Sequence, residues 1–484
     1  MTAVEQASAV SDSSTELQDL LTLQRDAFLK EGHVAYNTRI DRLDRCISLL
    51  VDNQPAICDA LAADYGGRSA RFTRMSEVMT SVGNLKNTKK HLKKWMKPER
   101  RRSPVPMNFL GAKASVHYQP KGVIGNMTPW NVPIGMIFSP LADIIGAGNR
   151  AMIKPSEFNP QTAELMKELV GKYFDPAEVS VITGGPEVGA AFSSLAFDHL
   201  LFTGATTIGR LVMRSAAENL TPVTLELGGK SPVIVGASAK LEDAVGKIIT
   251  GKAMNCGQLC ISPDYVFVPE DKVEQFVSLC QKEFEAQYPS AISNPDYNAM
   301  IAERHYERIQ GYLTDANSQG AHIVNLDSSG AAFDSKTKKI PLHIIVDPSD
   351  DLQVMQDEVF GPIMLVKPYQ QVSDCIHYIN ARPRPLALYY FGADSNEQAT
   401  VLDNTISGGA TVNNVMFHFS CDDLPFGGVG SSGIGHYHGF DGFRTFSHAK
   451  GVFKDGFVNL VKLAGMLPPY GEKTDKMLDS QIKK

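Results

Sequence analysis

The sequence lacks the features of several large classes of protein. Its most apolar long stretch, IGMIFSPLADIIGAG (134–148), is interrupted by Pro140 and Asp143 and is too short to cross a bilayer. The acidic N-terminus has neither a basic segment nor an apolar run, so it does not resemble a signal peptide. Its seven cysteines are an odd number scattered over 484 residues, unlike the framework of a small secreted domain. We expect free thiols, a cytoplasmic location, and disorder over residues 1–13.

The chain also lacks a strong net charge, a fixed-period repeat and a low-complexity block. A formal net charge of −6 provides no overall field that would gather nucleic acid or an anionic membrane. The exception is KNTKKHLKKWMKPERRR (86–102), which holds nine Lys or Arg residues. Leu85, Leu92 and Trp95 fall near helical spacing in and beside it. The segment therefore favours a solvated basic helix face, with a phosphate or partner patch as the alternative.

The sequence does contain a long alternation of short apolar runs and amphipathic helices. KASVHYQP (113–120) alternates like an exposed strand. Apolar runs and helices then alternate from GVIGNM (122–127) to PVTLELGG (222–229), and a second series runs from SPVIVG (231–236) to LALYYFG (386–392). This alternation predicts an α/β fold with parallel sheets covered on both faces. In such sheets ligands bind beyond the carboxyl ends of the strands.

Two cysteines lie four residues apart in GKAMNCGQLCISPDY (251–265). This spacing is not the usual zinc hook, and no second Cys/His pair follows nearby. A disulfide is disfavoured in a reducing compartment, and a lone cysteine is often an inert core residue. Cys260, however, stands among Asn, Gln and Gly, where irregular backbone can direct N–H groups at an oxyanion. Cys260 is therefore the candidate nucleophile and Cys256 a bystander.

Several polar residues follow the predicted strands. Glu226 ends an apolar run, where a carboxylate is costly unless it is paired or working, so it is a candidate general base; a strand-end Glu pointing to solvent is the alternative. Asn131 in TPWN can donate to an oxyanion. Lys154 and Glu157 in MIKPSE suit ribose hydroxyls or a phosphate. FTGATTIG (202–209) can bring backbone close to a phosphate, although it lacks the G-x-G-x-x-G fingerprint.

Seven motifs in this order resemble the aldehyde dehydrogenase superfamily: TPWN, KPSE, FTGxTxxG, LELGGKSP, GQxC, EVFGP and PFGGVGSSG. The separation of 34 positions between Glu226 and Cys260 also matches that family. The likeness covers about residues 121–451. Within the superfamily, LTPVTLELGGKSP and GIGHYHGFDGFRTFSH resemble the class 3 branch, and most closely the bacterial coniferyl aldehyde dehydrogenase group.

The resemblance implies NAD(P)-dependent oxidation of an aldehyde to a carboxylic acid through a thiohemiacetal and a thioester on Cys260. Asn131 and the backbone N–H of Cys260 would bind the oxyanion, and Glu226 would activate water. Coniferyl aldehyde, oxidised to ferulate, is the expected substrate; the alternatives are a medium- or long-chain aliphatic aldehyde or a coenzyme-A-acylating reaction. NAD is the expected cofactor, with NADP as the alternative, and no metal is expected. The cofactor-binding residues implied are Thr128, Trp130, Lys154, Glu157, Gly204, Ala205, Gly209, Leu227, Glu358 and Phe360.

The resemblance also implies a Rossmann-type parallel-sheet cofactor domain, an α/β catalytic domain and a β-strand oligomerisation element. An unpaired strand such as 113–120 favours a homodimer. No nucleic-acid or membrane partner is expected. A cysteine hydrolase without redox chemistry and a non-catalytic protein of the same fold are the rival hypotheses. The predicted division is a cofactor domain at 1–102 and 122–226, a catalytic domain at 227–430, the oligomerisation element at 103–121 and 444–456, and a C-terminal tail at 457–484.

Overall fold

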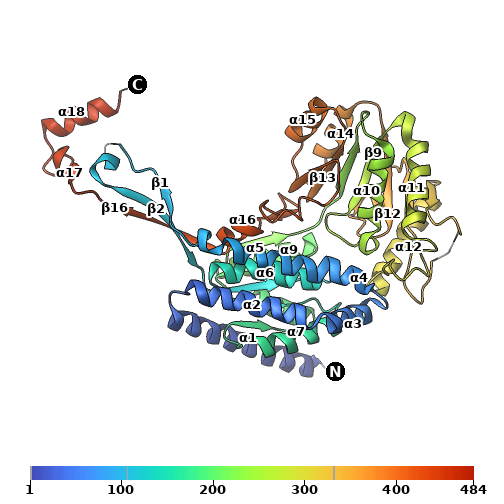
Figure 1. Cartoon of the computed structure of the whole chain (residues 1–484), viewed down its shortest axis with the longest axis horizontal. Helices are drawn as coiled ribbons and strands as arrows, with labels where there is room; N and C mark the ends of the chain where they lie inside the picture. Colours follow the sequence, from blue (N-terminus) through green and yellow to red (C-terminus); the bar gives the residue numbers. More distant parts are fainter. Residues whose placement is uncertain (1–2, 106, 331–332, 484) are drawn as a thin grey trace.

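The computed structural model describes residues 3–105, 107–330 and 333–483, with side chains from residue 14 onward, and these residues form three β-sheets with helices packed around the two larger ones (Figure 1). The chain begins with a run of helices. The first helix is assigned from Ala3, residues 1–2 lie outside the described residues, and the expected disorder over 1–13 stays a prediction. These elements are α1 (Ala3–Glu31), α2 (Tyr36–Asp52), α3 (Gln54–Tyr65), α4 (Ala70–Thr73), the π-helical turn η1 (Arg74–Met79) and α5 (Thr80–Trp95).

The first large sheet has the strand order β15-β7-β6-β3-β4-β5. All neighbours are parallel except β15, which pairs antiparallel with β7. From β3 the chain builds outward through β4 and β5, then returns to the other side through β6 and β7. The direction of winding therefore changes between β3 and β6, where ligands bind in open parallel sheets. The elements are β3 (Val123–Met127), α6 (Pro133–Ala147), β4 (Arg150–Lys154), α7 (Pro160–Tyr173), β5 (Val179–Val181), α8 (Pro186–Ser193), β6 (His199–Thr203), α9 (Thr206–Ala217), β7 (Val223–Glu226) and β15 (Gly433–Ile434).

The second large sheet has the order β10-β11-β12-β9-β8-β13-β14, with only β10 antiparallel to its neighbour among the described strands. Its central strands are buried along their whole length, as expected for a sheet covered by helices on both faces. The predicted α/β fold with parallel sheets is confirmed. The strands are β8 (Ser231–Val235), β9 (Pro263–Pro269), β10 (His322–Asn325), β11 (His343–Val346), β12 (Ile363–Tyr369), β13 (Ala387–Phe391) and β14 (Gly409–Val412). The helices and turns are α10 (Leu241–Ala253), η3 (Met254–Gly257), η4 (Glu270–Lys272), α11 (Val273–Gln287), α12 (Glu303–Ser318), α13 (Gln353–Gln356), α14 (Val372–Asn380) and α15 (Ser395–Asn404). Helix α16 (Gly439–Thr445) packs instead against α5 and α6.

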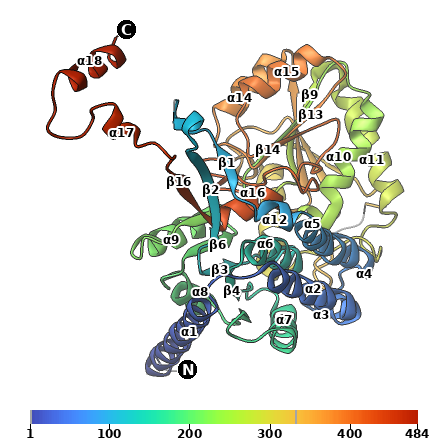
Figure 2. The same ribbon diagram turned by 60° about the vertical axis from the view of Figure 1, so that its left-hand side comes forward.

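The third sheet forms an arm that projects from the body (Figures 1 and 2). It is the antiparallel set β1 (Glu99–Arg101), β2 (Lys113–Pro120) and β16 (Ser447–Lys454). β2 has the bounds predicted from its alternating pattern. The short turn η2 (Met107–Leu110) lies between β1 and β2, and the chain ends beyond the arm in α17 (Leu460–Leu463) and α18 (Glu472–Gln481).

The basic segment lies mainly on α5, as an amphipathic surface helix. Leu85, Leu92 and Trp95 are buried, whereas Lys86 and Lys90 are exposed. The spacing of the apolar residues therefore predicted the buried face of this helix correctly. No helix in the described part of the chain combines the length and apolarity that a membrane span requires.

Candidate active site

A cavity of about 1680 Å³ is lined by loops from both large sheets. The first sheet contributes the loops that follow β3, β6 and β7, at the carboxyl ends of its strands, as predicted. The second sheet contributes mostly residues that precede β8, β9, β12 and β13, at the amino ends of its strands. The carboxyl edge of one sheet therefore faces the amino edge of the other across the cavity.

The structure brings most of the predicted site residues to this cavity. Thr128, Lys154, Glu157 and Gly209 are not part of its lining. The Thr128 N–H donates to the Lys154 carbonyl at 3.0 Å, so these two strand ends lie side by side. The predicted residues that do line the cavity are Trp130, Asn131, Gly204, Ala205, Glu226, Leu227, Cys260, Glu358 and Phe360.

A strained turn precedes Cys260. Asn255, Cys256 and Gly257 have φ angles of 50°, 56° and 72°, so three consecutive residues are left-handed. Such conformations are unfavourable for residues other than glycine and persist where surrounding contacts impose them. A Cβ at Gly257 would come within 2.3 Å of the Gly361 carbonyl oxygen, so this position also requires glycine.

The buried side chain of Gln258 holds this turn in place. Its Nε2 donates to the carbonyls of Asn255 (2.9 Å) and Ala299 (3.0 Å), and its Oε1 accepts from the Ile301 N–H (3.1 Å). All its side-chain polar atoms are thus paired inside the protein, as buried amides require. The sequence singled out a Gln near Cys260 but gave no indication that it ties the turn to residues about forty positions later.

The two cysteines of this segment differ in their surroundings. Cys256 is fully buried with its sulfur 3.7 Å from the Tyr297 hydroxyl, whereas Cys260 is partly buried and lines the cavity. Burial, assisted by the carboxylates of Glu358 and Glu226, raises the pKa of the Cys260 thiol to about 12; its own N–H and the next one oppose that rise. Both cysteines are free thiols. Burial in this cavity therefore favours the protonated form of the Cys260 thiol.

Glu226 is buried at the end of β7. Its side chain lines the cavity, the residue is only 2% exposed, and neither carboxyl oxygen has a hydrogen-bond partner among the described residues. The alternative of a strand-end Glu pointing to solvent is therefore wrong. Burial raises the pKa of this carboxyl well above its ordinary value. A desolvated carboxyl beside a thiol in a cavity is a typical candidate for proton transfer.

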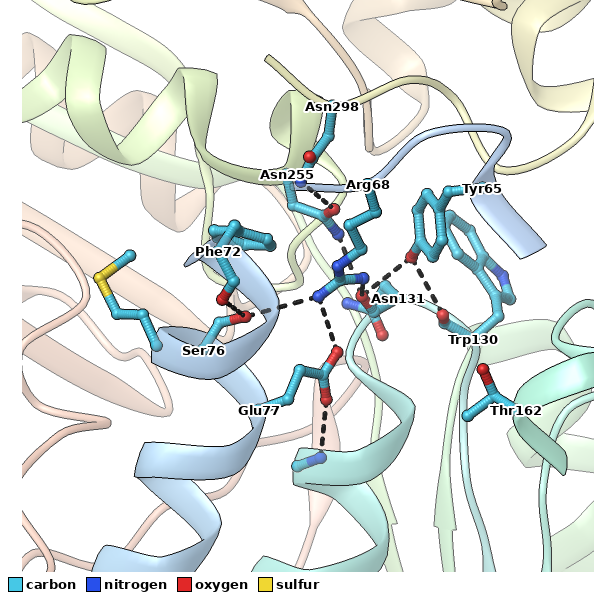
Figure 3. A network of polar contacts seen from close by, with 12 residues as sticks. Tyr65, Arg68, Phe72, Ser76, Glu77, Trp130, Asn131, Thr162, Asn255 and Asn298 are labelled. Atoms are coloured by element: carbon cyan, nitrogen blue, oxygen red, sulfur yellow. Dashed lines mark hydrogen bonds and ion pairs between the residues drawn. The ribbon is translucent and has the colours of Figure 1, made fainter. Parts of the chain in front are cut away.

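Asn131 lies in the loop between β3 and α6. Its side-chain Nδ2 donates to the Gln258 carbonyl at 3.0 Å, which links it to the segment that carries Cys260. Its own carbonyl accepts from Tyr65 and Arg68, and Arg68 is paired with Glu77 (Figure 3). Sequence reasoning missed these three residues. Arg68 follows two glycines in YGGRSA, a context that is typical of an exposed loop.

The residues around the cavity fit a dinucleotide. Gly204 and Ala205 precede α9, whose N-terminus has no side-chain cap, so its first N–H groups can face a phosphate. The Glu358 carboxyl, whose pKa burial raises to about 8, can accept from ribose hydroxyls. A Cβ at Gly228 would come within 1.9 Å of that carboxyl, so a larger residue there would displace the end of the Glu358 side chain. Lys154 contacts the Pro155 carbonyl at 2.9 Å beyond the next strand end.

Comparisons with known proteins agree with this geometry. Residues 4–452 match the profile of the Aldehyde dehydrogenase family. A Caulobacter vibrioides protein described as a probable coniferyl aldehyde dehydrogenase is 49% identical over 97% of each chain, and the coniferyl aldehyde dehydrogenase of a Pseudomonas species is 46% identical over 96% of this chain and 95% of its own.

Solved structures show the same fold. The substrate-bound state of Staphylococcus aureus AldH matches with a TM-score of 0.90 and 32% identity over the whole of both chains. A Mycobacterium tuberculosis aldehyde dehydrogenase complexed with NAD+ matches with a TM-score of 0.82 and 26% identity over 92% of this chain and 91% of its own. The chain described here therefore belongs to the aldehyde dehydrogenase family.

Proposed function

We propose that this NAD(P)-dependent aldehyde oxidoreductase converts coniferyl aldehyde to ferulate with NAD, through covalent adducts of Cys260. The observation that carries the proposal is the meeting of Cys260, Glu226 and Asn131 around one cavity. The three residues come from separate segments of the chain, and Glu226 is an unpaired buried carboxyl on the wall that Cys260 also lines.

The groups present account for each step of an aldehyde oxidation. The Cys260 thiolate attacks the aldehyde carbon, and the oxygen becomes an oxyanion that accepts hydrogen bonds from Asn131 Nδ2 and the Cys260 N–H. A bound dinucleotide supplies the acceptor for the hydride that this carbon loses, which leaves a thioester on Cys260. Glu226 takes a proton from water, the hydroxide attacks the thioester, and sulfur departs as thiolate with release of the acid.

The cavity wall supports an aromatic substrate. Aromatic and methionine side chains stack on a planar ring and adapt to its substituents, and the names of the Caulobacter and Pseudomonas relatives point to the same substrate. The wall also carries the hydroxyl groups of Ser76, Ser139 and Ser420, which can bind polar ring substituents. Its aromatic and methionine residues include Phe72, Met75, Met79, Met136, Phe417, Phe419 and Phe426.

Two further features extend the proposal. The seven free cysteines support a cytoplasmic location, because the cytoplasm is a reducing compartment.

β16 lies at an edge of the arm, and β14 at an edge of the second sheet, so both present unpaired backbone groups within the described structure. Together with exposed Phe453 and Phe109 on the arm, these edges support a homodimer.

The substrate assignment is tested by turnover. With NAD the protein is expected to form ferulate from coniferyl aldehyde with a higher kcat/KM than from medium-chain aliphatic aldehydes. Cys260→Ala is expected to lower kcat by about 10³-fold or more, because it removes the nucleophile, whereas the matched Cys256→Ala retains activity. Product is identified by chromatography. Acyl-CoA formed in preference to acid when coenzyme A is added would contradict the proposal. So would the absence of cofactor reduction with a panel of aldehydes, alongside ester cleavage.

The role of Glu226 is tested by separating the two half-reactions. Glu226→Gln is expected to slow steady-state turnover by about 10²-fold or more, because the water loses its base, while one equivalent of reduced cofactor still forms per site in stopped flow. Burial raises the pKa of Glu226, so the deprotonated fraction, and with it the hydrolysis of the thioester, is expected to rise with pH through that raised pKa. The variant should lose this rise. An unchanged pH profile would refute the assignment, and Glu168→Gln, on the exposed face of α7, is the control.

Cofactor preference is tested at Glu157. Its Oε2 lies 3.7 Å from Lys154 Nζ, and the side chain is 39% exposed, so it can meet the adenosine ribose beside the strand end. A 2′-phosphate there would meet a like charge. Glu157→Gln is expected to raise the kcat/KM for NADP relative to NAD by about two- to fivefold. A wild-type preference for NADP, or no change in the ratio, would contradict this placement.

The homodimer is tested by sedimentation. The purified chain, of 52.8 kDa, is expected to sediment at twice that mass. Phe109→Asp with Phe453→Asp is expected to shift it to the monomer at low micromolar concentration, because both side chains are exposed on the arm and a charge opposes their burial. Leu29→Asp, at an equally exposed apolar residue on α1, is the control. A monomeric wild type would refute the dimer.

A further inference from the structure

The main-chain carbonyl of Asn131 is held by three donors from two separate segments of the chain (Figure 3). Arg68 Nη1 donates to it at 2.9 Å, the Tyr65 hydroxyl at 3.0 Å and Asn255 Nδ2 at 3.1 Å. A carbonyl oxygen has two lone pairs, and one of these three donors is a full cation, so the peptide is anchored more firmly than a usual loop peptide. The anchored peptide belongs to the residue proposed to bind the oxyanion.

The cation itself is fixed inside the protein. Arg68 Nη2 lies 2.7 Å from Glu77 Oε1, and both side chains are fully buried. The guanidinium lies 4.8 Å from the ring centroids of Tyr65 and Phe72, in cation–π range of both. Glu77 Oε2 accepts from the Gly135 N–H at 2.8 Å, at the start of α6. The ion pair therefore holds the Asn131 loop at two points. Arg68 binds the Asn131 carbonyl, and Glu77 binds the first turn of α6, which follows the loop.

Glu77 comes from η1, a π-helical turn of the kind that occurs at functional sites. The same turn contributes Met75, Ser76 and Met79 to the cavity wall. Phe72, just ahead of η1, both lines the cavity and stacks on Arg68. One short segment thus supplies a wall of the cavity and the counterion of the cation that holds Asn131.

Asn131 needs such anchoring because the two N–H groups of its side-chain amide must each reach a separate acceptor. One N–H donates to the Gln258 carbonyl at 3.0 Å, which leaves the other for an oxygen in the cavity. A displacement of about 1 Å is enough to remove most of the benefit of an oxyanion donor. The side chain of Asn131 extends from this backbone, so the contacts that fix the peptide plane also fix the position of the Nδ2 donor.

We propose that Arg68, held by Glu77, is a positioning residue that fixes the Asn131 peptide so that its side-chain amide meets the oxyanion formed at Cys260. This inference rests on the proposed function. Arg68 lines no part of the cavity in the described structure, so it has no direct contact with a ligand there.

A double-mutant cycle tests this route. Arg68→Met is expected to lower the single-turnover rate of cofactor reduction about 30-fold in the wild-type background, with the KM for NAD changed by less than about twofold. In an Asn131→Ala background, the same substitution is expected to lower the rate by less than about threefold, because the donor it positions is already absent. Equal factors in the two backgrounds would overturn the inference.

Matched variants separate positioning from general destabilisation. Arg42→Met removes another buried arginine, which pairs with Glu31 and Glu178 far from this loop, and is expected to lower thermal stability without changing the single-turnover rate by more than about twofold. If Arg68→Met does not fold, Glu77→Gln and Tyr65→Phe, which preserve side-chain volume, enter the same cycle under the same criteria. A rate loss in Arg42→Met as large as in these variants would also overturn the inference.

The outcomes also separate this inference from the proposed function. Aldehyde oxidation that Asn131→Ala leaves undiminished would refute the oxyanion role of Asn131, and with it the premise of the cycle. Oxidation that falls in Asn131→Ala, while Arg68→Met acts by the same factor in both backgrounds, would refute the positioning role alone.

Discussion

Parallel strands end at a common edge, and this protein sets the carboxyl edge of one parallel sheet against the amino edge of another. The first sheet brings Asn131 and Glu226 to the cavity after β3 and β7; the second brings Cys260 and Glu358 ahead of β9 and β12. Neither sheet alone brings Cys260, Glu226 and Asn131 together. The site therefore depends on how the two sheets meet, and Asn131 Nδ2 bonding the Gln258 carbonyl is a direct contact across that junction.

Desolvation gives the site its chemical character. Burial raises the pKa of both Glu226 and Cys260, and the charge of Glu226 raises the pKa of Cys260 further. A thiolate and a carboxylate that were charged at the same time would repel each other in such a cavity. On the proposed mechanism this suits the sequence of steps, because the thiolate is needed first and the carboxylate base only after the thioester has formed.

Much of the fold was readable in the sequence because periodicity reports burial directly. The alternating residue pattern predicted the bounds of β2. Continuous apolar runs indicated β3, β8 and β13, because both faces of those strands are covered. Cys260 and Glu226 stood out because their residue types are unusual in their local context. The identity and order of the motifs, together with the separation between Glu226 and Cys260, indicated which residues belong together.

The remainder depends on contacts between distant segments, which local patterns do not report. In the sequence, Arg68 and Glu77 resemble surface charges. In the structure both side chains are buried, and Arg68 bonds the loop that follows β3. The amino edge of the second sheet faces the cavity, although the general rule for parallel sheets points to carboxyl edges. Cys260 follows a left-handed turn, and its own backbone N–H and that of Ile261 lower the pKa of its thiol against the effect of burial. On the proposed mechanism, the Cys260 N–H that favours an anionic sulfur also donates to the substrate oxygen that becomes anionic next. The negative charge can therefore pass from sulfur to oxygen without a movement of the backbone.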